Sequence, residues 1–287
     1  MTVLEAIQKS TAFLEHKGVE SPRLQVELLL AATLRMPRLK LYLDFERVLA
    51  PEQIQTLREL VLQRGRHIPL QHLLGNTSFC GHDIIVNRDV LIPRPETEQL
   101  AERALEFLNA WPGKSPLHAL DFGTGSGCLA LTLALALPRL EIDAVDISEA
   151  ALSVARRNIQ HHGVADRIEL LHGDGFDALA AGRRYALILS NPPYIPTADI
   201  ATLDPEVRDH DPHDALDGGA DGLDFYRRLA TDAAPWLAPG GRSMVELGHG
   251  QKEAVSQLFT QAGWQIRGVH DDDNGIPRIF IACRPGT

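Results

Sequence analysis

Residues 117–137, with the sequence LHALDFGTGSGCLALTLALAL, decide the fold class of this chain. The apolar residues at the start predict a β-strand, the alternate glycines predict a turn, and the apolar run after them predicts a buried helix. Glycines let the backbone approach a ligand closely, and the start of a helix offers unpaired N–H groups. The stretch therefore predicts a strand, turn and helix that bind a ligand at the turn. The glycine spacing, GxGxG, differs from the GxGxxG of a dinucleotide site.

Two further strands are expected to place carboxylates beside this turn. The stretch EIDAVD at 141–146 predicts a strand that ends in Asp146, about 20 residues beyond the glycines, as expected for an acid that binds ribose hydroxyls. The stretch RIELLH at 167–172 predicts a third strand, and Asp174 just beyond it is well placed to bind an adenine amino group. The helix between these strands is expected to be capped by Ser148.

The rest of the sequence continues the alternation of strands and helices. Such alternation with short loops is typical of an α/β fold with a doubly wound, mostly parallel sheet. The last two apolar runs, 264–269 and 278–284, have no helix between them, so we expect them to pair as an antiparallel hairpin at the sheet edge. The other expected elements are a strand at 185–190, a helix from Leu223 to about Ala234, a strand at 242–247 after a turn at 238–241, and a helix from about Gln251.

The residues Asn191-Pro192-Pro193-Tyr194 follow directly on the strand expected at 185–190. They provide a way to hold a planar NH2 group, whose nitrogen is a poor nucleophile because its lone pair is delocalised. The Asn191 side-chain oxygen can accept one hydrogen, the Pro192 carbonyl can accept the other, and the two prolines stiffen the backbone. The alternative is that these residues only terminate a strand, since proline cannot join a sheet ladder.

The first part of the chain has a different pattern from the rest. Apolar residues recur there at helical spacing, and Ser21 followed by Pro22 predicts a helix that is capped by the serine and has proline in its first turn. We therefore expect residues 1–75 to form a small N-terminal helical bundle domain. Alternating residues around a glycine predict a β-hairpin linker at 76–90, which leaves 91–287 for the larger domain.

Composition and charge limit the classes of protein to which this chain can belong. The chain has 287 residues, with 28 basic and 38 acidic side chains and a formal net charge of −10. Because DNA affinity depends on neutralising phosphates, this balance argues against direct DNA binding. No segment has the pattern of a signal peptide or a membrane span, and the three cysteines suggest neither a disulfide framework nor a zinc pair. We expect a soluble cytoplasmic protein that needs no metal and has no membrane partner.

Several motifs taken together resemble those of the HemK/PrmC family. This family methylates the side-chain amide nitrogen (N5) of glutamine in the Gly-Gly-Gln motif of peptide chain release factors. The resemblance spans nearly the full length, and its most specific part is the combination of LIPRPETE at 91–98 with NPPY at 191–194. It also rests on the loop at 121–127, on VDIS at 145–148, and on ALDGG and DGL between 215 and 223.

The resemblance implies a class I methyltransferase fold, S-adenosylmethionine as cofactor and release factors as protein substrates, so that the enzyme modulates translation termination. Residues 1–75 would help to dock the substrate. The catalytic and substrate-binding residues would be Asn191, Pro192, Pro193 and Tyr194, with Tyr194 packed against the plane of the amide. The cofactor-binding residues would be Gly123, Thr124, Gly125, Ser126, Gly127, Asp146, Asp174, Gly175 and Asn191. Relatives often carry an aromatic residue at position 175, and Phe176 is the neighbouring alternative for stacking on adenine.

Three other functions fit some of these motifs. A ribosomal-protein glutamine methyltransferase would differ only in the residues of the IPRPETE string. An adenine N6 DNA methyltransferase would share the NPPY geometry. The third alternative is a cofactor-binding subunit that has lost turnover, and the intact NPPY motif and Asp146 argue against it.

Two polar features have open interpretations. The His- and Asp-rich stretch at 209–214 has the composition of a metal site but the position of a loop. Arg94 and Glu96 lie on a Pro-x-Pro frame, either near the cofactor pocket or in an interdomain ion pair.

Overall fold

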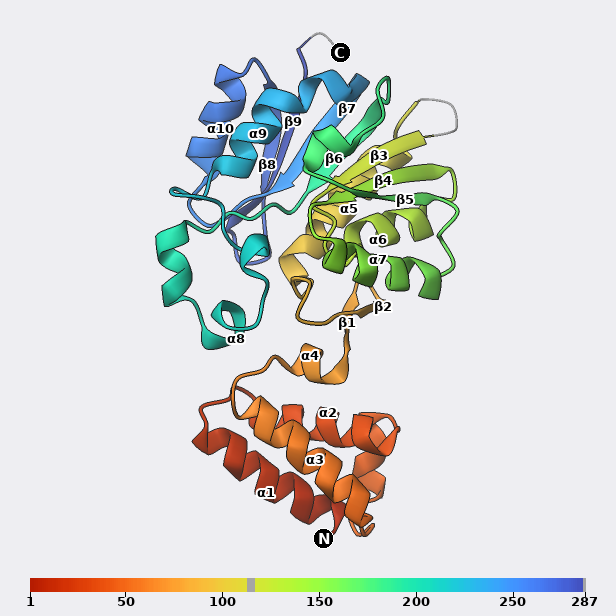
Figure 1. Cartoon of the computed structure of the whole chain (residues 1–287), viewed down its shortest axis with the longest axis vertical. Helices are drawn as coiled ribbons and strands as arrows, with labels where there is room; N and C mark the ends of the chain where they lie inside the picture. Colours follow the sequence, from red (N-terminus) through yellow and green to blue (C-terminus); the bar gives the residue numbers. More distant parts are fainter. Residues whose placement is uncertain (113–116, 286–287) are drawn as a thin grey trace. The chain divides into compact units, whose positions relative to one another are not determined.

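The computed structural model describes residues 1–112 and 117–285, and the chain divides into two compact units. Unit 1 comprises residues 1–76 and 204–210, and unit 2 comprises residues 77–203 and 211–287. Figure 1 colours the elements of both units by sequence. No helix within the described residues is both long and apolar enough to cross a membrane.

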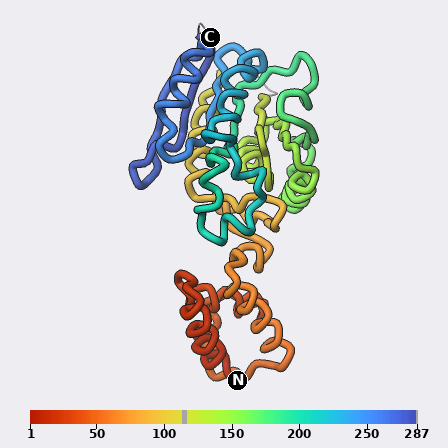
Figure 2. The backbone as a smooth tube through the Cα atoms, turned by 60° about the vertical axis from the view of Figure 1, so that its left-hand side comes forward, coloured from red at the N-terminus to blue at the C-terminus, as the bar shows by residue number. Residues whose placement is uncertain are grey.

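Residues 1–76 of unit 1 form a small helical bundle, traced in red and orange in Figure 2. The elements of unit 1 are α1 (Val3–His16), α2 (Pro22–Leu34), the 3-10 helix η1 (Arg38–Leu43), α3 (Pro51–Arg64) and α4 (Leu70–Leu74), together with the short α8 (Pro205–Arg208). The helices α1, α2 and α3 bury one face each, and the core includes Leu14, Leu29, Leu30, Leu41 and Leu57. This confirms the predicted N-terminal helical bundle.

One predicted cap in this unit is wrong. Pro22 begins α2, but Ser21 lies in the left-handed region at φ 45° and its side chain makes no capping hydrogen bond. A capping serine needs an extended backbone to turn its hydroxyl toward the helix start, and the left-handed conformation does not provide it. Helix α1 has instead a capping box, in which Thr2 and Glu5 hydrogen bond to each other's backbone N–H groups.

Unit 2 contains a seven-stranded sheet in the order β5-β4-β3-β6-β7-β9-β8. All neighbouring pairs are parallel except those of β9, which runs antiparallel to both β7 and β8. This confirms the doubly wound, mostly parallel sheet and its antiparallel hairpin at the edge. The strands are β3 (Leu117–Phe122), β4 (Leu140–Asp146), β5 (Ile168–His172), β6 (Tyr185–Ser190), β7 (Leu237–Glu246), β8 (Gln265–Asp271) and β9 (Pro277–Cys283).

Helices cover both faces of this sheet (Figure 1). On one face pack α5 (Pro95–Asn109), α6 (Cys128–Ala136) and α7 (Glu149–His161), which share one apolar cluster. On the other pack α9 (Asp224–Asp232) and α10 (Lys252–Gln261), which share a second cluster. Helix α7 is capped as predicted, since the Ser148 side chain accepts a hydrogen bond from Ala151 N.

The remaining elements are short. A two-stranded sheet of β1 (Asn76–Phe79) and β2 (His82–Ile85) precedes α5, and the 3-10 helices are η2 (Gly175–Ala178), η3 (Thr197–Thr202), η4 (His213–Ala215) and η5 (Ala234–Trp236). Strand β7 begins earlier than predicted, because residues 238–241 stay within it and a register shift against β6 between Tyr185 and Leu187 absorbs the irregularity.

The strand order decides where a ligand can bind. The chain leaves β3 toward β4 on one side and returns to β6 on the other side, so β3 is flanked by both strands. Ligands of open α/β sheets bind at such a reversal of strand order, beyond the carboxyl ends of the strands. The residues that follow β3, β4 and β6, which include the glycine turn, Asp146 and Asn191, therefore meet at one edge of the sheet.

Candidate active site

A cavity of about 260 Å³ lies at this edge of the sheet and is largely lined by residues that the sequence analysis singled out. The predicted site residues in its lining are Gly123, Thr124, Gly125, Ser126, Asp146, Asp174, Gly175, Asn191 and Pro193. The predicted residues Gly127, Pro192 and Tyr194 lie outside that lining. Residues without a predicted role also line it, among them Thr97, Phe122 and Arg228.

The glycine turn after β3 has a backbone conformation that favours glycine and is fixed by backbone hydrogen bonds. Gly123, Gly125 and Gly127 all have positive φ angles, at 76°, 54° and 79°, which a residue with a Cβ atom rarely adopts. A Cβ atom on Gly127 would come within 3.1 Å of Ala155, so this glycine lets the turn pack closely on α7. The N–H groups of Gly123 and Thr124 both donate to the carbonyl of Val145, which ties the turn to the end of β4.

Asp146 connects the two strand ends. Its Oδ2 accepts a hydrogen bond from Gly125 N at 2.8 Å, and its Oδ1 accepts one from Ser148 N at 2.9 Å. Burial raises the pKa of this carboxyl, whereas the backbone hydrogen bonds act in the opposite direction. Each carboxylate oxygen has a further lone pair, so both can still accept hydrogen bonds from ligand hydroxyls in the cavity.

Asp121 braces the turn from below, a role that the sequence analysis missed. Its side chain is buried, and its Oδ2 accepts hydrogen bonds from Thr124 Oγ1 at 2.7 Å and from Ala130 N at 3.2 Å. Because Ala130 lies in the first turn of α6, the carboxylate serves an otherwise unpaired N–H group of that helix. Burial raises the pKa of Asp121 to about 6.

The wall beside Asp174 explains why position 175 carries a glycine. Arg228 donates hydrogen bonds to the Asp174 side chain and, at 2.6 Å, to its backbone carbonyl, and its guanidinium lies 5.8 Å from the centre of the Phe122 ring. A Cβ atom on Gly175 would come within 2.6 Å of Phe122 and 3.1 Å of Arg228. These two side chains occupy the space that an aromatic residue at 175 would take.

Phe176 does not take over the missing aromatic position. Its ring is buried between Phe122, at a centroid distance of 4.9 Å, and Trp236, at 6.2 Å, and it is not part of the cavity lining. The side chain belongs to the apolar core under α9, so the aromatic group that faces the cavity beside Gly175 is Phe122.

The Asn191 side chain hydrogen bonds to a residue outside the NPPY motif. Its Nδ2 donates to Thr97 Oγ1 at 3.1 Å, and Thr97 Oγ1 donates in turn to Glu246 Oε2 at 2.6 Å. Thr97 and Glu246 are both buried, and their hydrogen bond joins the start of α5 to the end of β7. The sequence analysis missed both residues, because nothing in their local pattern indicates that they meet across 149 positions.

Tyr194 is held by a loop that surrounds its backbone. Gln251 Nε2 donates to the carbonyls of Tyr194 at 2.8 Å and Gly222 at 3.2 Å, and its Oε1 accepts from Gly248 N at 3.1 Å. A Cβ atom on Gly222 would come within 2.4 Å of the Tyr194 carbonyl oxygen. The glycine at 222 is therefore needed for this close approach.

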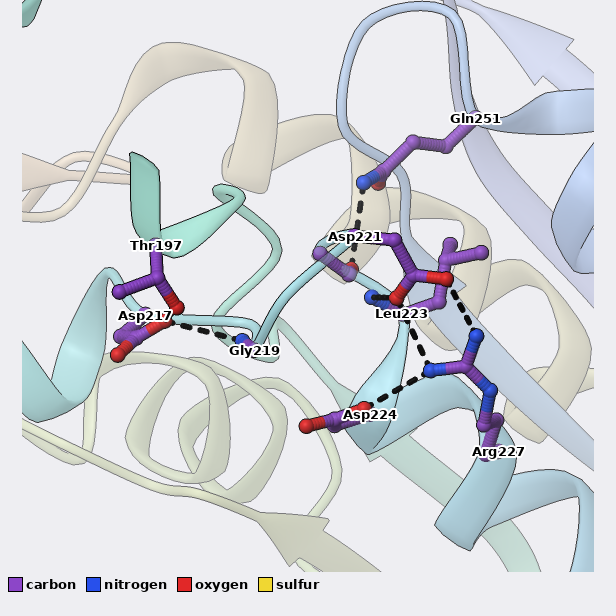
Figure 3. Close-up of polar contacts among 9 residues, drawn as sticks. Thr197, Asp217, Gly219, Asp221, Leu223, Asp224, Arg227 and Gln251 are labelled. Atoms are coloured by element: carbon purple, nitrogen blue, oxygen red, sulfur yellow. Dashed lines mark hydrogen bonds and ion pairs between the residues drawn. The ribbon is translucent and has the colours of Figure 1, made fainter. Parts of the chain in front are cut away.

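The same loop is braced by side-chain contacts at both ends (Figure 3). Asp217 Oδ1 accepts hydrogen bonds from Thr197 Oγ1 at 2.7 Å and from Gly219 N at 3.0 Å. Arg227 on α9 pairs with Asp221 and, at 2.8 Å, with Asp224. The motifs ALDGG and DGL thus form a fixed support for the segment that follows NPPY.

Arg94 lies beside the cavity and forms an ion pair within unit 2. Its Nη2 lies 2.8 Å from the buried Asp211 Oδ2, and both residues belong to unit 2, so this ion pair is not an interdomain one. Arg94 is also outside the cavity lining, although its neighbours Pro93 and Thr97 are part of it. Among the described residues, no group of three or more His, Cys, Asp or Glu side chains is arranged to hold a metal ion.

Comparisons with known proteins agree with this architecture. Family models for the PrmC N-terminal domain and for the methyltransferase small domain match residues 5–75 and 105–203. The crystal structure of a methyltransferase from Pyrococcus furiosus, 19% identical, superposes with a TM-score of 0.51 over 71% of this chain and 90% of the other, which supports the fold.

Relatives of nearly the same length identify the family. The release factor glutamine methyltransferase of Geobacter sulfurreducens is 44% identical over 97% of this chain and 95% of its own. That of Chlorobaculum tepidum is 42% identical over 96% of this chain and 95% of its own. Both agree with the resemblance carried by the IPRPETE and NPPY motifs. The chain therefore belongs to the release factor glutamine methyltransferase family.

Proposed function

We propose that this protein transfers a methyl group from S-adenosylmethionine to the side-chain amide nitrogen, N5, of the glutamine in the Gly-Gly-Gln motif of peptide chain release factors. The observation that carries the proposal is that Asn191 and Asp146 line one cavity. A group suited to a carboxamide and a group suited to a ribose thus face the same space. Because release factors act on ribosomes, we infer that the protein works in the cytoplasm and modulates translation termination.

The residues of the cavity fit S-adenosylmethionine. The positive φ angles of the glycine turn leave room for the methionine part, and the carboxylate of Asp146 has free lone pairs for the ribose hydroxyls. Asp174 and the Phe122 ring would receive the adenine, with Gly175 between them. When bound, the cofactor supplies an electrophilic methyl group on a sulfonium centre.

The remaining chemistry is a matter of positioning the substrate amide. Asn191 Oδ1 and the Pro192 carbonyl would each accept one N–H of the glutamine side chain, and the Tyr194 ring would pack beside its plane. Holding the two reacting groups in line removes an entropic barrier that is worth up to roughly 7–11 kcal/mol in ideal systems. The methylated amide nitrogen is strongly acidic and loses its proton to water, so no strong general base is needed.

One assay separates this proposal from its competitors. The purified protein is incubated with labelled S-adenosylmethionine and, in parallel, with a release factor, ribosomal proteins and DNA, and the label is located by mass spectrometry. We expect label on the glutamine of the Gly-Gly-Gln motif. Label on a ribosomal-protein glutamine or on adenine, with none on the release factor, would overturn the substrate assignment.

Asn191→Ala is the matched variant for the mechanism. Deleting one well-placed polar partner typically lowers turnover by about 10²–10³-fold, and we expect a loss of that size with the fold retained. Asn274→Ala, in an exposed turn, serves as the control. If Asn191→Ala methylated the release factor at the wild-type rate, the NPPY mechanism would be wrong.

We further propose that unit 1 docks the protein substrate through the 3-10 helix η1. Leu39 and Leu43 on η1 are 72% and 85% exposed, and Tyr42 between them is 43% exposed. Exposed apolar patches mark sites of protein–protein contact. The buried Glu27 holds this segment in place, because it accepts hydrogen bonds from Arg38 at 3.0 Å and from Tyr42 at 2.8 Å.

Leu43→Glu tests this docking role. We expect it to raise the KM for a full-length release factor while the kcat and the cofactor affinity stay unchanged. The control is Leu62→Glu on α3, where the leucine is 42% exposed. An unchanged KM in Leu43→Glu would remove the role of η1.

A further inference from the structure

Thr97 links the Asn191 carboxamide to a buried carboxylate, and the direction of each hydrogen bond can be assigned. A hydroxyl has one proton. Thr97 Oγ1 lies 2.6 Å from Glu246 Oε2. When Glu246 is ionised, its carboxylate only accepts, so the threonine proton points at Glu246. Toward Asn191, at 3.1 Å, Thr97 Oγ1 can then only accept. The Asn191 NH2 group therefore faces Thr97, which leaves Oδ1 as the outward-facing group.

We propose that Glu246, acting through Thr97, is a positioning residue that fixes which end of the Asn191 carboxamide faces the substrate. This inference deepens the proposed function and rests on it. A glutamine NH2 group can only donate, so it needs Oδ1 of Asn191. If the Asn191 carboxamide were turned by 180°, its NH2 group would face the NH2 group of the substrate glutamine, and neither group can accept a hydrogen bond. We call the hydrogen-bond chain from Glu246 through Thr97 to Asn191 the relay. With Glu246 ionised, the relay disfavours the turned carboxamide before the substrate binds.

Glu246 is also fixed from its backbone. The Tyr226 hydroxyl donates a hydrogen bond to the Glu246 backbone carbonyl at 2.8 Å. Burial raises the pKa of Tyr194, and the Glu246 charge raises it further. The carboxylate at the end of β7 thus acts on Asn191 through Thr97, and its charge acts on Tyr194 as well.

The relay has a pH dependence that follows from its polarity. Burial raises the pKa of Glu246 to about 7, opposed by the Thr97 hydrogen bond and by Arg278 on β9, whereas Glu96 on α5 raises it further. Arg278 is itself paired with Asp272 at 3.3 Å. A protonated Glu246 can donate to Thr97, which frees the threonine proton to donate to Asn191 Oδ1. The carboxamide would then turn its NH2 group outward, so turnover should fall as the pH drops below about 7.

Three variants test the relay. Thr97→Val removes the hydroxyl at nearly constant volume, Thr97→Ser keeps it, and Glu246→Gln keeps an acceptor for Thr97 but cannot titrate. Thr132→Val, a buried threonine on α6 outside the cavity lining, is the matched control. Measurements are kcat and KM with a release factor, cofactor affinity by calorimetry, and the kcat profile between about pH 6 and 8.

The expected results differ from those of a purely structural role. Thr97→Val should lose about 10²–10³-fold in kcat with unchanged cofactor affinity, and Thr97→Ser should recover most of that loss. Wild-type kcat should rise through a pKa of about 7, and the Glu246→Gln profile should be flat there. A wild-type kcat in Thr97→Val, or a wild-type pH step in Glu246→Gln, would overturn the relay while leaving the proposed function intact.

A measurement without turnover separates the two proposals completely. The side-chain amide resonances of Asn191, followed by NMR, should shift with the ionisation of Glu246 in the wild type and lose that step in Thr97→Val and in Glu246→Gln. Resonances that do not respond would overturn the relay even if the release factor is methylated. A response without any methylation would leave the relay standing and reject the proposed function.

Discussion

The Oδ2 atom of Asp146 accepts a hydrogen bond of 2.8 Å from the backbone N–H of Gly125. This bond joins the carboxylate that ends β4 to the glycine turn that follows β3. Two groups proposed to hold different parts of one cofactor are thus fixed relative to each other before that cofactor binds. Preorganisation of this kind reduces the ordering cost of binding.

Asp146→Ala should weaken the binding of S-adenosylmethionine. Hydrogen bonds to a charged group contribute about 1.5–3 kcal/mol each, so we expect a rise of roughly 10–100-fold in the dissociation constant measured by calorimetry. Asp166→Ala, where the carboxylate is 79% exposed and outside the cavity lining, is the control. Equal affinities in the two variants would contradict the ribose assignment.

Gly175→Ala should destabilise the protein more than an ordinary glycine substitution. The residue has a φ of +60°, and its new Cβ atom would lie 2.6 Å from the Phe122 ring. We expect a loss of about 1–3 kcal/mol in the free energy of unfolding, measured with urea. Gly182→Ala separates the two causes, since Gly182 has a φ of +89° but no atom within 4 Å of its Cβ position. Equal losses in both variants would show that the contact with Phe122 has no energetic effect.

Asp121→Asn should remove a pH-dependent part of the stability. Burial raises the pKa of Asp121 from 3.8 to about 6, so the folded protein holds this proton more tightly than the unfolded chain does. The stabilisation from protonated Asp121 is therefore complete below about pH 3.8 and is lost as the pH rises through about 6. We expect the unfolding free energy of the wild type, relative to Asp121→Asn, to decline over this interval and to stay constant above it. A difference that stays constant from about pH 4 to 8 in urea titrations would be inconsistent with the raised pKa.

Gln251→Ala should loosen the support behind Tyr194. The substitution removes hydrogen bonds to the Tyr194 carbonyl, the Gly222 carbonyl and the Gly248 N–H, and an unsatisfied buried group typically costs about 1–3 kcal/mol. We expect faster hydrogen exchange in residues 216–223 and a lower kcat, with unchanged cofactor affinity. Gln261→Ala, on an exposed position at the end of α10, is the control. Unchanged exchange in Gln251→Ala would exclude this supporting role.

The sequence predicts those parts of the fold that depend on local patterns. The glycine turn, the cap at Ser148 and the alternation of strands and helices each reflect a short-range rule, and the structure follows them. The cap at Ser21 fails because the backbone of this residue is left-handed, and no local pattern predicts that conformation for a serine.

The polar supports of the site were beyond the reach of local patterns. Thr97 and Glu246 are 149 positions apart, and neither has a neighbour that marks it as polar and buried. Phe176 is the opposite case, a residue that local sequence places at the site and the structure places elsewhere. Its position next to Asp174 suggests a place at the cavity, but the backbone turns its ring into the core against Trp236.

Strand β9 lies between β7 and β8, although β8 comes first along the chain. Strand β8 therefore pairs with the sheet through β9, and the ladder places Ile279 of β9 opposite Glu246 of β7. The edge hairpin thus flanks the carboxylate that accepts the Thr97 hydrogen bond. A substitution that loosens this hairpin, far along the chain from NPPY, is expected to hydrate Glu246 and let the Asn191 side chain rotate.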